Sequence, residues 1–141
     1  MPPNSSPDAV VQRLTILRNG LLALHKSLLD SERDSYEKDI GRITSSGQFL
    51  NLVLHDPWFA WLRELSELIV LIDESLAAEQ PPVMGDAERF FFQVRSLVAP
   101  DENGSGFRKN YFDAMQRDPA IVLAHRDMTR LLELAGKREL R

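Results

Sequence analysis

Three histidines, His25, His55 and His125, are the side chains that first suggest a reactive or metal-binding site. Carboxylate-type metal sites in helical bundles use Glu-x-x-His pairs, and zinc proteases use His-Glu-x-x-His. Neither pattern occurs in this chain. If the first two helices form a hairpin that turns near residue 45, His25 and His55 differ by about ten residues, or ~15 Å, along the helix axes. We therefore predict no metal site: His25 and His125 each have one hydrogen-bonded ring nitrogen, and His55 bonds a carbonyl freed by the following proline.

Two further chemistries start from the first predicted helix. Histidine phosphotransfer domains place a lysine three positions after the reactive histidine, whereas Lys26 directly follows His25 and points about 100° away from it. Enzymes of the chorismate mutase type clamp a dicarboxylate with basic residues of a long first helix. The candidates for such a clamp are Arg13, Arg18, Lys26 and Arg33. Their spacings of five, eight and seven residues do not place them on one face, so we predict no catalytic residue and favour a protein that is not an enzyme.

Composition narrows the function classes further. The 141 residues are 43% hydrophobic, which suffices for one core, and the absence of cysteine excludes disulfides, thiolate zinc sites and cysteine nucleophiles. A net charge of −4 disfavours nucleic-acid binding. The apolar stretches are shorter than the ~18 residues of a membrane span, and residues 1–7 lack the pattern of a signal peptide. We therefore expect a cytoplasmic protein with no membrane span, nucleic-acid partner or cofactor.

The first helix is expected from residue 8 to about Ile43. Ser6 has the residue type of an N-cap, and Pro7 suits the first helical position. The segment after Asp30 is mostly polar, so the helix either continues or restarts at Ser31, and we favour one long helix. Its buried stripe is predicted from leucines at spacings of three and four, namely Leu14, Leu17, Leu21, Leu24 and Leu28.

The rest of the chain predicts three more main helices, two of them interrupted. Ser45, followed three residues later by Gln48, starts the second helix, which Asp56-Pro57 should break before it ends near residue 80. A third helix is expected from Asp86, as its cap, to about residue 98.

The fourth main helix should begin at Phe107, break at Asp118-Pro119 and end near Gly136. No segment shows the alternation of a half-buried strand. We predict an all-α antiparallel bundle of four main helices in one domain, residues 8–136, with a flexible leader (1–7) and a tail (137–141).

The Asp56-Pro57 break is the strongest candidate for a ligand pocket. A kink leaves backbone groups without helical partners, and aromatic side chains beside it supply apolar walls. The residues expected to line this pocket are Tyr36, His55, Asp56, Trp58 and Trp61.

The same stretch resembles a family of small bacterial helical proteins. The resemblance rests on Leu54–Arg63, with its core Asp-Pro-Trp-Phe-Ala-Trp-Leu, followed by Leu65–Val70 and Ile72–Glu74, and it covers roughly a sixth of the chain. It implies a bacterial origin and a helical fold. Because that family has no established activity, the resemblance assigns no catalytic residue.

Two functions follow from these patterns. The first is a non-enzymatic interaction or regulatory module, whose partner is a second copy or another protein, bound through the first helix or the aromatic-rich face. Its basis is a set of apolar helix stripes without a convergent group of reactive side chains. The alternative is a bundle that binds a small molecule or metal in the pocket at the Asp56-Pro57 break.

Overall fold

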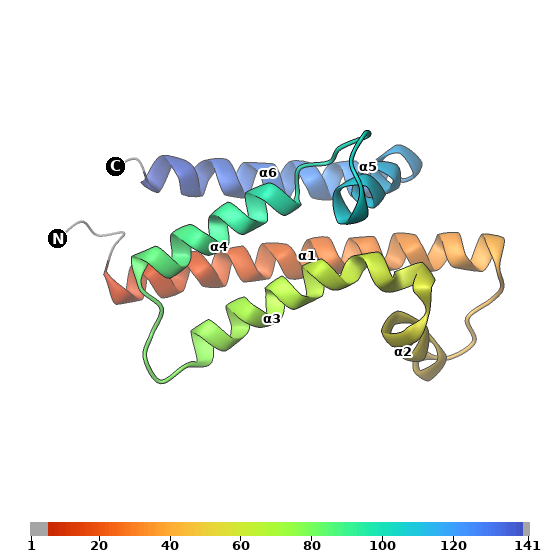
Figure 1. Ribbon diagram of the computed structural model, residues 1–141, viewed down its shortest axis with the longest axis horizontal. Helices are drawn as coiled ribbons and strands as arrows, with labels where there is room; N and C mark the ends of the chain where they lie inside the picture. Colours follow the sequence, from red (N-terminus) through yellow and green to blue (C-terminus); the bar gives the residue numbers. More distant parts are fainter. Residues whose placement is uncertain (1–5, 140–141) are drawn as a thin grey trace.

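The computed structural model describes residues 6–139, with side chains described as far as Ala135. Every regular element in these residues is helical, which confirms the predicted all-α fold. The elements in chain order are α1 (Pro7–Asp39), α2 (Ser46–His55), the 3₁₀ helix η2 (Pro57–Leu62), α3 (Arg63–Ala77), α4 (Met84–Leu97), α5 (Gly106–Arg117) and α6 (Pro119–Glu139) (Figure 1).

The long first helix is confirmed as one uninterrupted element with the predicted cap. The Ser6 hydroxyl accepts a backbone N–H of the first turn at 3.2 Å, and Pro7 begins the helix. α1 ends at Asp39 rather than Ile43, because the Ile43 N–H donates to the Glu37 carboxylate at 3.2 Å and the chain turns back there. The predicted stripe of five leucines is buried in the core: Leu14, Leu17, Leu21, Leu24 and Leu28.

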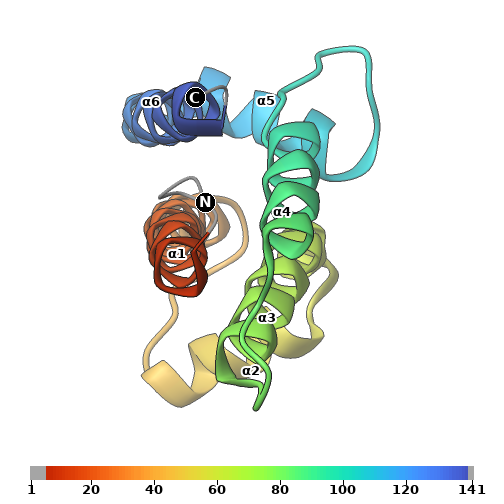
Figure 2. The same ribbon diagram turned by 90° about the vertical axis from the view of Figure 1, so that its left-hand side faces the viewer.

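Both predicted Asp-Pro breaks are present. Asp56 and Asp118 have extended backbone conformations, and each carboxylate accepts the backbone N–H two residues further on, at 2.8 Å and 3.0 Å. Pro57 then begins η2 and Pro119 begins α6. Because the backbone bends at each aspartate, α2 and α5 lie across the long helices (Figures 1 and 2). The described chain therefore has six α-helices where we expected four main ones.

Two predicted helix ends differ from the structure. Val83, not Asp86, caps α4, and Asp86 is the third helical residue, where its carboxylate accepts the Val83 N–H at 2.9 Å. This contact places the cap of the helix three residues earlier than expected. α6 continues past Gly136, so the backbone of the expected tail is helical to Glu139.

α1 is the central element of the structure. α6 packs along one flank of it, above it in Figure 2, and α3 and α4 pack along a neighbouring flank, to its right. Gly20 lies against Leu131, and Glu32, further along α1, contacts Arg117 just before α6 begins, so α1 and α6 run antiparallel. The partners that bury the leucine stripe of α1 thus come from the middle of the chain and from its last helix.

The chain ends fall partly outside the described residues. Residues 1–5 of the expected leader and residues 140–141 of the expected tail belong to that undescribed part, whereas Ser6 and Pro7 already form the cap and first turn of α1. None of the helices in the described part combines the length and the apolar content that a membrane crossing requires.

Candidate functional site

The three histidines lie in separate environments. His25 Nε2 is 2.7 Å from the Ser66 hydroxyl, between α1 and α3, and His125 Nδ1 is 2.7 Å from the Tyr111 hydroxyl, between α6 and α5. Each therefore has the hydrogen-bonded ring nitrogen that we predicted. His55 is exposed at the end of α2, and its ring makes no hydrogen bond within the described chain. The freed carbonyl of Leu54 instead accepts from Arg63 at 3.4 Å, which corrects the role predicted for His55. Within residues 6–135, no three acidic or imidazole side chains gather as metal ligands do.

Tyr111 of α5 and His125 of α6 are two titratable side chains that form a hydrogen bond between neighbouring helices. Burial raises the pKa of Tyr111 and lowers the pKa of His125 below its ordinary value of 6.5, so both groups stay neutral. A buried hydroxyl needs an acceptor for its proton, so we assign Tyr111 as the donor to Nδ1. Thr129, 3.5 Å from Nε2, completes the surroundings of the ring. The Glu133 carboxylate borders the same hollow of about 450 Å³ without a hydrogen bond to the ring in the described chain, and the Tyr111–His125 bond links α5 to α6.

The residues predicted to line a pocket at the Asp56-Pro57 break pack against different neighbours. Tyr36 packs edge-on against Trp58, with ring centroids 5.7 Å apart. Trp61 faces the other way and packs on Phe107 of α5 at 5.3 Å. The Asp56 carboxylate is occupied as a backbone cap.

The break thus contains an aromatic cluster. It comprises Tyr36, Phe49, Trp58 and Phe59, with the Arg33 guanidinium 4.8 Å from the Phe49 ring. The indole N–H of Trp58 is buried without a hydrogen-bond partner in the described chain. Ligand binding at the break stays a prediction, and the arrangement of its side chains favours packing.

A different surface is hollowed, along the outer side of α1 and α6. We call it the α1–α6 groove. Its lining residues are Gly20, Ala23, Leu24, Ser27, Ala120, Leu123, Ala124, Asp127, Met128 and Leu131, and its volume is about 280 Å³. A second hollow of about 210 Å³ shares Leu131 and extends toward Ile16 and Leu134. Both hollows border Leu131; the first is lined mainly by apolar and small residues, and Arg13 and Phe91 also line the second.

Small residues of α1 line the groove where α6 packs against this helix. A Cβ atom at Gly20 would lie 2.6 Å from a methyl carbon of Leu131, so only glycine allows α6 to approach this closely. Ala23 and Ser27 continue the same face, at spacings of three and four residues. On α6, Leu123 and Leu134 remain about half exposed beside them, at 53% and 54%.

The opposite side of α1 is closed by polar contacts. Arg18 lies 3.2 Å from Asp73, and His25 bonds Ser66, so two pairs bridge the seam between α1 and α3. Among the described residues, no such pair bridges the α1–α6 groove. The one carboxylate in the groove lining is that of Asp127, whose side chain is 74% exposed. The two sides of α1 are therefore different in kind, and the apolar one is open.

Comparisons with protein-family models, with curated proteins and with solved structures found no match. The resemblance of Leu54–Arg63 to a bacterial helical family stays a prediction, and function has to be argued from the geometry.

Proposed function

We propose that this protein is a non-enzymatic interaction module that binds a helix of a protein partner in the α1–α6 groove. The carrying observation is the open, mainly apolar α1–α6 groove along two antiparallel helices, lined by small residues at helical spacing. Grooves of this kind receive amphipathic helices through side chains at i, i+3, i+4 and i+7. Half-exposed leucines beside small residues supply the ridges and hollows on which such packing depends.

The reactive groups support the same reading. His25 and His125 are held as neutral rings by hydroxyl groups of neighbouring helices, and His55 stands alone at the surface. His125 shares a hollow with Thr129 and Glu133, but among the described residues no hydrogen bond joins the Glu133 carboxylate to the ring, so this carboxylate does not orient the imidazole.

A designed peptide tests the groove directly. The probe is a fluorescent amphipathic helix of about 18 residues with leucines at i, i+3, i+4 and i+7. Its binding is measured by fluorescence anisotropy for the native protein, for Ala23→Glu, which places a charge in the groove, and for Leu71→Glu, which places one on the half-exposed outer face of α3. We expect Ala23→Glu to weaken binding about tenfold or more and Leu71→Glu to leave it unchanged. Equal binding by Ala23→Glu and the native protein, or no binding by either, would refute the proposal.

A further inference from the structure

α6 carries an exposed stripe at the edge of the α1–α6 groove. Leu123, Asp127, Arg130 and Leu134 follow one another at spacings of four, three and four residues, so they lie along one line of the helix. Leu123 and Leu134 are about half exposed, the Asp127 side chain is 74% exposed, and Arg130 is exposed. The chemical order along the stripe is apolar, acidic, basic, apolar.

This order is complementary to itself when the helix is turned end for end. A two-fold axis between Asp127 and Arg130 brings Leu123 opposite Leu134 of a second copy and Asp127 opposite Arg130 of that copy. Both pairs share one midpoint, between residues 128 and 129, so a single register satisfies them together. Each contact then occurs twice, as a symmetric dimer interface requires, and the contact closes at two copies.

The two charged residues of the stripe also favour a second copy as the partner. Asp127 lines the groove, and its nearest cation, Arg126, is 3.9 Å away. Arg130 has no carboxylate within ion-pair distance in the described part of the chain. A purely apolar helix over the groove would cover Asp127 without a close counter-charge, which is costly. A second copy supplies a guanidinium at that position.

The other charges near the groove do not disturb this pairing. Lys26 and Asp30, on the exposed side of α1, already pair with each other at 2.8 Å. The small side chain of Ala23, which is exposed and lines the groove, leaves room into which the leucines of an arriving helix can pack.

We propose that the helix bound at this face is α6 of a second copy, packed antiparallel about the two-fold axis between Asp127 and Arg130. The proposal rests on the proposed function of the groove and names its partner. The dimer places charged pairs at the centre of the contact and leucine pairs at both ends.

Charge reversal tests the register. Asp127→Arg and Arg130→Asp each oppose like charges across the axis, so we expect either change to weaken dimerisation about tenfold or more in sedimentation equilibrium. The double variant restores both pairs with their signs exchanged and should dimerise as the native protein does. An equimolar mixture of the two single variants should form a heterodimer, because one copy then carries two arginines and the other two aspartates.

Controls separate this proposal from loss of folding and from the proposed function. Glu67→Arg, at an exposed position of α3, makes the same charge change as Asp127→Arg and should leave dimerisation intact. Circular dichroism checks each fold, and Asp127→Asn and Arg130→Gln should weaken association in the same direction with less change of charge. A native protein that stays monomeric, single variants that dimerise normally, or a mixture that forms no heterodimer would overturn the two-fold contact. If the designed peptide still binds in an Ala23-dependent way, the groove function stands without it.

Discussion

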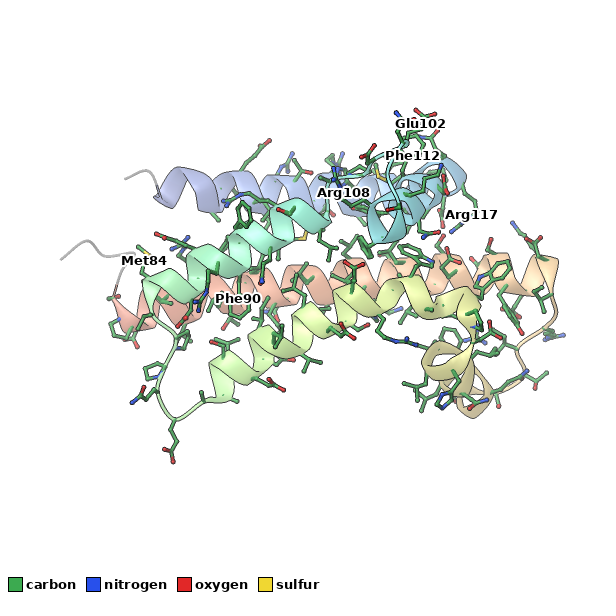
Figure 3. The ribbon with its side chains drawn as sticks, in the orientation of Figure 1. Met84, Phe90, Glu102, Arg108, Phe112 and Arg117 are labelled. Carbon is green, nitrogen blue, oxygen red and sulfur yellow. The ribbon has the colours of Figure 1, made fainter. Side chains whose placement is uncertain are left out.

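The ion pair that joins the end of α5 to α1 allows a stability change to be predicted in detail. Arg117 Nη2 lies 2.8 Å from Glu32 Oε1 and also donates to the Ser31 hydroxyl at 3.3 Å (Figure 3). Glu32 is 5% exposed and Ser31 is 4% exposed, so the partly exposed Arg117 side chain is the hydrogen-bond donor to two buried residues. Because Arg117 directly precedes the break into α6, this contact also sets how α6 approaches α1. The perturbation is Arg117→Met, which keeps an unbranched apolar side chain and removes the guanidinium group with its charge.

The expected loss of stability follows from the Glu32 carboxylate, which stays buried after the arginine is removed. Removing one partner of a fully buried ion pair costs about 3–5 kcal/mol, since the other charge is left in the interior. The Arg117 side chain is 39% exposed, so water can partly replace it, and we expect a loss of about 2 kcal/mol in the free energy of unfolding. The measurement is urea unfolding followed by circular dichroism.

A matched double variant decides whether the buried charge is the cause. Glu32→Met with Arg117→Met leaves no charge in the contact, so its loss should be smaller than that of Arg117→Met alone. A loss below about 0.5 kcal/mol for Arg117→Met, or a double variant as unstable as the sum of both single changes, would refute this reasoning.

Three other predictions concern the histidines, a cap and a glycine. Burial lowers the pKa of His25 and His125 below 6.5, so the unfolded chain takes up protons that the folded chain does not; the urea midpoint should be constant above about pH 7 and fall as the pH drops below 6.5. Asp56→Ala removes the acceptor for the first free N–H of η2 and should cost about 1 kcal/mol in thermal or urea unfolding. Gly20→Val forces Leu131 away from α1 and should cost about 1–3 kcal/mol by the same unfolding measurement.

Each of these has a control. His25→Gln should flatten the decline below pH 6.5, and a midpoint independent of pH would contradict the role of the buried rings. Asp56→Asn keeps a side-chain acceptor and should retain most of the stability that alanine loses. Gly41→Ala meets no atom within 4 Å, so a loss as large as that of Gly20→Val would show that close packing at Gly20 is not the cause.

Local signals in the sequence predicted the elements. The Ser6-Pro7 start, the Ser45 cap and both Asp-Pro breaks depend on residues within one or two turns, and all are present in the structure. The leucine stripe of α1 was predictable from its spacing alone because an apolar stripe must be covered. The prediction that Asp86 caps α4 was wrong, because an acidic residue at the third helical position and one at the cap give the same local sequence pattern.

The contacts between distant segments were not predictable from local patterns. The α1–α6 groove depends on Gly20 meeting Leu131, more than a hundred residues along the chain, and on a register that no short motif encodes. The Tyr111–His125 bond depends on the angle at the Asp118 break in the same way. Trp61 was assigned to the pocket because it follows the Asp56-Pro57 break closely in the sequence. Its contact with Phe107 of α5 depends on tertiary packing, which the local sequence does not encode. The spacing of Leu123 and Leu134 was the one available signal for the open face of α6.

The most direct measurement of the docking face uses the absence of native cysteines to place one spin label per chain. Val122→Cys puts the label on α6, beside the proposed two-fold contact and outside it, where Val122 is 45% exposed. Antiparallel α6 helices in the proposed register bring the two labels to roughly 20–30 Å, a range that pulsed dipolar spectroscopy resolves. We predict a narrow distance distribution in that range, which disappears when Asp127→Arg is added. A distribution that Asp127→Arg leaves unchanged, or no dipolar coupling at high protein concentration, would contradict the account.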